Sequence, residues 1–131
     1  MERIDLLFKS AVAATGGVVA YWLGGLDKLL ISLLVLIVVD YITGILKGIY
    51  HKNLSSEIGF KGIAKKVMCL SIVALAFVIQ NLTDYAFAVR EIVIVFFIAN
   101  EGISILENAA QIGLPVPRKL RDVLEQLKGK V

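Results

Sequence analysis

The sequence has very few of the residues that build disulfides, metal sites and nucleophilic active sites. Cys69 is the single cysteine and His51 the single histidine among 131 residues. A lone cysteine cannot form a disulfide framework within the chain, which excludes a disulfide-stapled secreted module. A histidine-based metal site, or a nucleophile assisted by histidine, also cannot be assembled within one copy. We therefore expect neither an enzyme nor a protein that binds a cofactor or metal.

Charge is scarce as well. Only 19% of the residues are charged, 58% are hydrophobic, and the mean hydropathy is +0.83. Soluble domains have about 45–50% apolar and about 25% charged residues. A soluble chain of this size must cover a small core with polar surface, and a disordered chain needs low hydrophobicity. The composition excludes both classes and predicts a small integral membrane protein with one domain, residues 1–131.

Apolar stretches long enough to cross a membrane occur at four places. A helix needs about 20 mostly apolar residues to cross a hydrocarbon layer of ~30 Å, and a backbone in lipid must satisfy its own hydrogen bonds. We therefore expect an all-α, polytopic fold with four transmembrane helices. Three spans, with the glycine-rich first segment lying in the interface, is the alternative. The predicted spans are residues 10–26, 29–46, 65–83 and 87–112, followed by a tail at 113–131.

Basic residues are concentrated in two segments. The positive-inside rule assigns lysine-rich and arginine-rich segments to the cytoplasmic side. The segment between the second and third spans and the C-terminal tail are both basic, so both termini are expected on the cytoplasmic side of a bacterial cytoplasmic membrane. Because these charges border apolar spans, membrane topology explains them better than nucleic-acid binding. The residues expected at the inner membrane surface are Lys47, Lys52, Lys61, Lys65, Lys66, Arg118, Lys119 and Arg121.

The tail has the pattern of a short amphipathic helix. Gly113, Pro115 and Pro117 are expected to end the fourth helix, because proline lacks an N–H and disfavours a helical residue before it. Beyond them an apolar residue recurs at i, i+3, i+4 and i+7. Such a helix can lie on an anionic inner leaflet, pack on a neighbouring subunit, or be a solvated tail that only fixes topology. Its apolar face consists of Leu120, Val123, Leu124 and Leu127.

The polar residues within the predicted spans are grouped. Intramembrane ionisable groups are costly, so they usually face protein or water. Asp40 and Thr43 share one stripe of the second span, and six polar residues of the fourth helix fall within an arc of roughly 120°. Phe96, Ile103 and Ala110 lie opposite, on a side that suits lipid. The stripe either borders water in an assembled pore or forms buried hydrogen bonds between helices. Its fourth-helix members are Asn100, Glu101, Ser104, Glu107, Asn108 and Gln111.

Small residues at four-residue spacing indicate close contacts between helices. Gly16, Ala20 and Gly24 follow this spacing in the first span, and Gly44 and Gly48 follow it in the second. Such positions let helix backbones approach each other in a membrane. They predict tight packing or assembly into a homo-oligomer.

Three stretches of the sequence resemble a known family. Asp40-Tyr41-Ile42-Thr43-Gly44-Ile45-Leu46-Lys47-Gly48 is similar to the Asp-x-x-Thr-Gly stretch of the small phage holins that include clostridial toxin-secretion holins. Asn100-Glu101-x-Ile103-Ser104-Ile105-Leu106-Glu107-Asn108 and the following Gly113-Leu114-Pro115-Val116-Pro117 strengthen the likeness, which runs from Asp40 to Leu127.

The resemblance implies a function that composition alone does not reach. Holins of this kind oligomerise in the bacterial cytoplasmic membrane and open lesions at a set time. A peptidoglycan-degrading endolysin, or in some systems a large toxin, then leaves the cell. Two other functions stay open from the residues themselves. One is a small non-lytic channel or transporter, and the other is a membrane anchor for a cytoplasmic partner.

Overall fold

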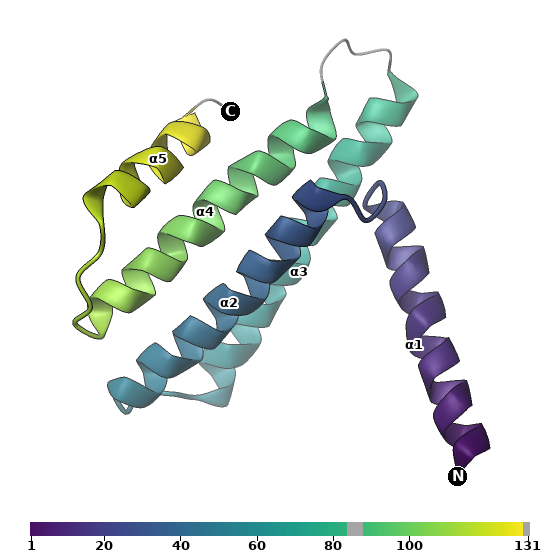
Figure 1. Cartoon of the computed structure of the whole chain (residues 1–131), viewed down its shortest axis with the longest axis horizontal. Coiled ribbons are helices and arrows are strands. Elements are labelled where there is room, and N and C mark those ends of the chain that lie inside the picture. The colour runs from purple at the N-terminus through teal and green to yellow at the C-terminus, as the bar shows by residue number, and fades with distance from the viewer. Residues whose placement is uncertain (84–87, 130–131) are drawn as a thin grey trace.

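The computed structural model describes residues 1–83 and 88–129, which form five helices joined by short connections (Figure 1). This confirms the all-α prediction and the short C-terminal helix. The break after the fourth helix falls at Gly113, Pro115 and Pro117, as expected. The helices are α1 (Glu2–Trp22), α2 (Lys28–Tyr50), α3 (Ser56–Leu82), α4 (Val89–Gln111) and α5 (Arg118–Gly129).

Helices α2, α3 and α4 form the body of the molecule. They run alternately up and down, α5 folds back along α4, and α1 diverges from the rest (Figure 1). The core lies between the three central helices, where Leu30, Leu33 and Val73 are fully buried together with Ile94. No residue of α1 is buried.

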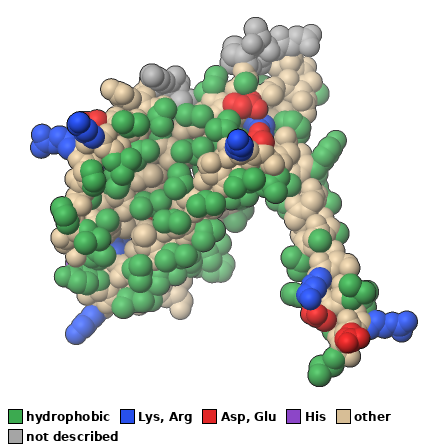
Figure 2. Space-filling model, viewed as in Figure 1, with side chains coloured by type: hydrophobic (Ala, Val, Ile, Leu, Met, Phe, Trp, Pro, Cys, Tyr) green, Lys and Arg blue, Asp and Glu red, His purple; other side chains and the backbone are tan. Residues whose placement is uncertain are grey.

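Three of the described helices, α1, α2 and α3, are long and apolar enough to cross a membrane, with mean hydropathies of 1.3, 2.6 and 2.1. Hydrophobic side chains cover most of the visible face of the bundle, which is consistent with a membrane protein (Figure 2). Helix α4 is not among the three, and it carries Arg90, Glu91, Glu101 and Glu107. The fourth span therefore stays a prediction.

Two of the helices begin well before the apolar stretches predicted. α1 begins at Glu2 rather than residue 10, and α3 begins at Ser56 rather than residue 65. The hydroxyl of Ser55 caps α3 by accepting the Ile58 N–H at 3.2 Å, and such a cap fixes a helix start regardless of hydropathy. Lys61, predicted to lie between the second and third spans, is therefore helical, together with Lys65 and Lys66 at the start of the predicted third span. The predicted first residue of the fourth span, Phe87, lies outside the described residues.

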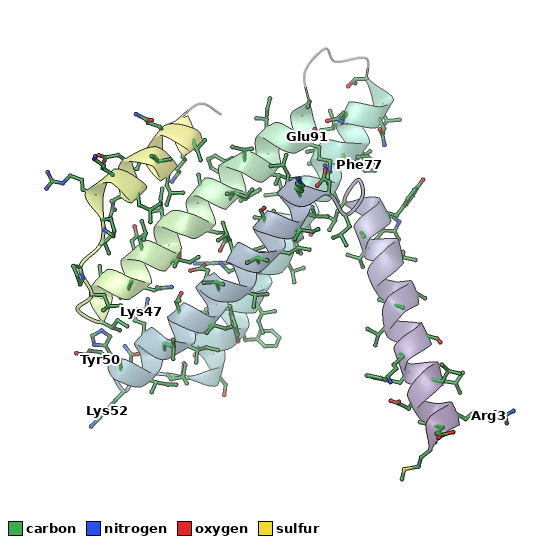
Figure 3. All side chains as sticks on the ribbon, in the orientation of Figure 1. Arg3, Lys47, Tyr50, Lys52, Phe77 and Glu91 are labelled. Atoms are coloured by element: carbon green, nitrogen blue, oxygen red, sulfur yellow. The ribbon has the colours of Figure 1, made fainter. Side chains whose placement is uncertain are left out.

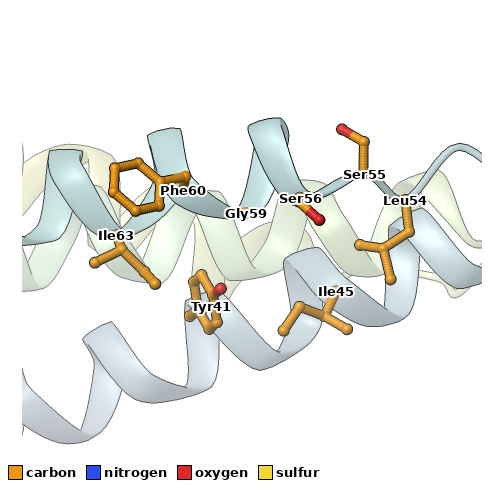
Figure 4. A pocket seen from close by; sticks show the side chains of 8 residues that line it. All are labelled: Tyr41, Ile45, Leu54, Ser55, Ser56, Gly59, Phe60 and Ile63. Carbon is orange, nitrogen blue, oxygen red and sulfur yellow. The ribbon is translucent and has the colours of Figure 1, made fainter.

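Tyr41 of α2 packs against two glycines of α3 (Figure 4). A Cβ at Gly59 would lie 3.3 Å from the Tyr41 hydroxyl, and one at Gly62 would lie 3.5 Å from its ring. The absence of side chains there lets the ring lie close to α3. A groove beside this contact is lined mainly by Ile45, Leu54 and other apolar side chains.

The small residues predicted at helix contacts have different surroundings. A Cβ at Gly44 would lie 3.9 Å from the Asn108 amide of α4, and one at Gly48 would lie 3.0 Å from Leu54 after α2. Gly16 has no neighbour within 4 Å of a Cβ, and Ala20 is half-buried. Gly24 lies in the α1–α2 turn rather than in a helix. Gly16 thus makes no close contact within the described chain, whereas a Cβ at Gly24 would overlap the side chains of Arg90 in α4 and Phe77 in α3.

Arg90, in the first turn of α4, ties this helix to the α1–α2 turn. Its side chain is 2% exposed. Nε donates to the carbonyl of Leu23, and Nη2 donates to the carbonyl of Gly25 at 2.9 Å. Nη1 pairs with the Asp27 carboxylate at 2.8 Å. One buried guanidinium therefore holds the turn at two carbonyls and one carboxylate.

Asp27 serves two elements at once. Its Oδ1 accepts the Leu30 N–H at 2.9 Å and caps α2. The hydrogen bond from Arg90, and then the one from Leu30, hold the pKa of the Asp27 carboxyl below its ordinary value. Figure 3 shows Phe77 and Glu91 at this end of the bundle and Lys47 and Lys52 at the opposite end.

The α1–α2 turn predicts that alanine lowers the free energy of unfolding by different amounts at two neighbouring glycines. Gly24 and Gly25 both have positive φ, 92° and 100°, so alanine at either costs about 1–2 kcal/mol. A Cβ at Gly24 would also overlap the side chains of Arg90 and Phe77, whereas one at Gly25 meets nothing within 4 Å. Gly24→Ala should therefore lower the free energy of unfolding in mixed detergent micelles by about 1–3 kcal/mol more than Gly25→Ala. Equal losses would contradict the described turn.

Candidate functional site

A cluster of ionisable side chains lies in the middle of the α2–α3–α4 bundle. The ammonium of Lys66, on α3, pairs with Asp40 of α2 and with Glu101 of α4, the second at 2.5 Å. The Lys66 side chain is 18% exposed, and those of Asp40 and Glu101 are 7% and 5% exposed. Each of the three central helices thus contributes one charge to the cluster.

Two neutral side chains extend the cluster toward the ends of α2 and α4 that carry Lys47 and Gln111. The Asn108 amide donates to Asp40 Oδ1 at 3.1 Å and to the Thr43 hydroxyl at 2.9 Å. The Thr43 hydroxyl in turn donates to the backbone carbonyl of Asp40 at 2.9 Å. These bonds join α2 to α4 directly, beside the ion pairs.

Helix spacing explains why these residues meet. Asp40 and Thr43 are three residues apart on α2, and Glu101 and Asn108 are seven apart on α4, so each pair lies on one helix face. The antiparallel arrangement of the two helices brings both pairs to one level. With formal charges, two carboxylates and one ammonium leave one excess negative charge. Removing one partner of a buried ion pair lowers the free energy of unfolding far more than removing one partner of an exposed ion pair.

The structure divides the polar stripe predicted on α4. Glu101 and Asn108 point into the bundle, which matches the interpretation as buried hydrogen bonds between helices. Asn100 is exposed and Ser104 is half-buried. Both line a groove between α3 and α4 that also reaches Lys66 and Glu101.

The remaining stripe residues lie near the end of α4. The Glu107 carboxylate is 53% exposed and lies 3.7 Å from the Arg121 guanidinium of α5. Gln111 is exposed, and its backbone carbonyl accepts a hydrogen bond from His51 Nε2 at 2.9 Å. Neither side chain joins the buried cluster.

One of the basic residues predicted at the inner membrane surface, Lys66, lies inside the bundle. Lys66 was expected beside Lys65 at the surface, but its ammonium is inside the bundle because two carboxylates of other helices pair with it. Lys47 is half-buried. The exposed members of the set are Lys52, Lys61, Lys65, Arg118 and Lys119, and Arg121 is half-buried.

Sequence reasoning missed the roles of Lys66 and of the Arg90–Asp27 pair. Neither Arg90 nor Asp27 is among the predicted site residues. A usable signal exists for the Arg90–Asp27 pair. Asp27 directly precedes α2 and Arg90 lies in the first turn of α4, and opposite charges at the starts of two antiparallel-bundle helices at the same end are candidates for pairing.

Comparisons with known proteins find one matching family and several relatives along most of the chain. The family model for the bacteriophage holin family matches residues 17–129. A 14.9 kDa protein from the nagH 3′ region of Clostridium perfringens is 41% identical over 131 residues, which covers 99% of each chain. A probable holin of Bacillus phage phi105 is 36% identical over 107 residues, 82% of this chain and 79% of that one. No solved structure matches the chain.

The cluster predicts a large difference between two adjacent lysines. Lys66→Met leaves two buried carboxylates without their ammonium and should lower the free energy of unfolding in mixed micelles by about 3–5 kcal/mol. Lys65→Met, at an exposed position, is the matched control and should change it by less than about 0.5 kcal/mol.

Neutralising the partners should rescue the loss. In the triple variant Lys66→Met/Asp40→Asn/Glu101→Gln no unpaired charge remains, so most of the lost stability should return. Similar losses for Lys66→Met and Lys65→Met, or no recovery in the triple variant, would contradict the described ion pairs.

Proposed function

The chain belongs to the bacteriophage holin family, and on that premise we propose that residues 1–131 act as one membrane domain that oligomerises in the bacterial cytoplasmic membrane. The assembly opens lesions, through which a peptidoglycan-degrading endolysin or a large toxin leaves the cytoplasm. The observation that carries the proposal is the family match over residues 17–129, which covers all of α2, α3, α4 and α5.

The proposed topology has four spans with both termini in the cytoplasm. α1, α2 and α3 meet the length and hydropathy of membrane spans, and α4 has 23 residues, about 35 Å at 1.5 Å per residue. The alternating helix directions support this arrangement, because the α2–α3 connection and the start of α5 then lie at one end of the bundle (Figure 1). The lipid bilayer and further copies of the chain are the proposed direct partners, and the endolysin or toxin is cargo.

The buried cluster supports the proposal that α4 has two arrangements, one in the closed chain and one in the open assembly. In the closed chain, Glu101 pairs with Lys66, and Asn108 donates hydrogen bonds to Asp40 and Thr43. The groove with Asn100 and Ser104 gives this polar face a route to the surface. In the open assembly the face of α4 from Asn100 to Gln111 borders water, which solvates the groups that the closed chain pairs internally.

Inducible expression in bacteria tests the function against its alternatives. The expected result is an abrupt loss of membrane integrity with escape of a folded cytoplasmic reporter enzyme into the medium. Ion flux without reporter escape would replace the proposal by a small channel or transporter. Unchanged permeability, with the protein present in the membrane fraction, would leave a membrane anchor.

The water-facing role of α4 is tested at an exposed stripe residue. Asn100→Leu leaves the buried ion pairs intact but removes a polar group from the proposed water-lined face, so it should delay or prevent reporter escape. Ser71→Leu, at an exposed position of α3 outside the groove, is the control and should leave the time of escape unchanged.

Glu101→Leu extends the test to the buried part of the stripe and should alter the time or extent of escape. All three variants are compared at equal amounts in the membrane fraction. Where the unaltered protein releases the reporter, unchanged escape in both Asn100→Leu and Glu101→Leu would refute a water-facing stripe without refuting the lytic function.

A further inference from the structure

Helix α5 packs along the second half of α4. A Cβ at Gly102 would lie 3.0 Å from both methyl carbons of Leu124, so the leucine fills the place of a missing side chain. One ion pair, from Arg121 to Glu107 at 3.7 Å, accompanies this contact. Figure 1 shows α5 folded back beside α4.

The side of α4 near this contact is the one that the sequence assigned to lipid. Ala99 and Ile103 lie opposite Glu101 at 100° per residue, yet they are 0% and 8% exposed. α2 and α3 pack on the Glu101 side, and α5 packs on the side that carries Gly102. α5 therefore occupies the place where a transmembrane α4 would meet acyl chains.

This position conflicts with an α4 that faces lipid. Gly102 lies nine residues before the end of α4, about 14 Å along the axis, which is close to half of a ~30 Å hydrocarbon layer. The α5 residues turned away from α4 include Asp122 and Glu125, both exposed, and ionisable groups are costly in lipid. α5 cannot both remain on α4 and leave that face of α4 to the acyl chains.

The sequence of α5 fits a second location. Lys119 and Lys128 lie on the two flanks of the apolar face, roughly 80° and 100° from Leu127, while Asp122 and Glu125 lie nearly opposite. Leu120 and Val123 remain 47% and 52% exposed with α5 on α4. An apolar face flanked by lysines is the arrangement that lies in the interface of an anionic membrane, where the lysines reach the headgroups.

We propose that α5 is a reversible cover with two positions, one on the Gly102 face of α4 and one on the anionic inner leaflet. Transfer of α5 to the lipid surface uncovers the apolar face of α4. The partner of α5 in the second position is an anionic phospholipid headgroup layer. The proposal concerns the chain in a bilayer and stands whether or not the chain lyses cells.

Cross-linking between α4 and α5 tests the two positions. The full chain carries Cys69→Ala, so that only the introduced pair Glu107→Cys/Arg121→Cys reacts. It is placed in nanodiscs of phosphatidylcholine alone, or of phosphatidylcholine mixed with phosphatidylglycerol. The cysteines replace the two long side chains of an observed ion pair, so a bismaleimide reagent that spans the length of those side chains should link them rapidly in neutral discs and several-fold more slowly in anionic discs.

Matched variants distinguish the contact of α5 with α4 from its contact with lipid headgroups. Lys119→Gln/Lys128→Gln should lower the ratio of released to docked α5 in anionic discs by about 30-fold, because each lysine contributes about a factor of five at an anionic surface. Asp122→Asn/Glu125→Gln, with equally many substitutions on the opposite side of α5, should keep or increase the lipid dependence. Gly102→Ala should slow the reaction in both discs, because its Cβ displaces Leu124.

Four results would overturn the proposal. Rapid linkage in both discs would mean that α5 stays on α4, and slow linkage in both would mean that it does not dock in a bilayer. Linkage chiefly between two chains would assign α5 to a neighbouring copy. Lipid dependence that persists in Lys119→Gln/Lys128→Gln would exclude headgroup recognition by these lysines.

Discussion

Lys66 shares its ammonium between Asp40 of α2 and Glu101 of α4, and none of these charges can move far without leaving another unpaired in a low-dielectric interior. The apolar core alone permits helices to slide or rotate, since leucine and isoleucine contacts are interchangeable along a helix. The ion pairs and the Asn108 bonds permit one register. The positions of the groove, of the polar face of α4 and of the surface left to α5 all follow from that register.

Much of the fold could be predicted from the sequence because its signals are local. Apolar runs located the helices, and Gly113, Pro115 and Pro117 located the break before α5. The helix starts could not be read from hydropathy, because capping by Ser55 extends α3 through three lysines. Lys66 shows a second limit of prediction from the sequence. Its neighbours in sequence indicate a membrane-surface lysine, and its partners come from two other helices whose rotation only tertiary packing decides.

The two ends of the bundle are held by different means. At one end Arg90 binds backbone carbonyls and Asp27, so the α1–α2 turn is fixed to α4 by directional hydrogen bonds from a buried charge. At the other end His51 bonds the Gln111 carbonyl, and Arg121 and Glu107 are partly exposed. Exposed ion pairs contribute little to stability. A rearrangement of α4 and α5 therefore meets less resistance at the end that carries the basic residues.

Helix α1 joins this framework only through its turn, and none of its residues is buried. The choice of amino acid at such exposed positions is constrained by the surrounding medium and not by the shape of neighbouring side chains. All side chains of residues 2–19 are exposed, so an exchange of one apolar residue for another there leaves the buried core unchanged. The match to the family model begins at residue 17, close to the end of α1 and just before the part of the chain that packs on other helices. α1 is thus the part of the molecule whose composition can vary while the fold of the rest stays the same.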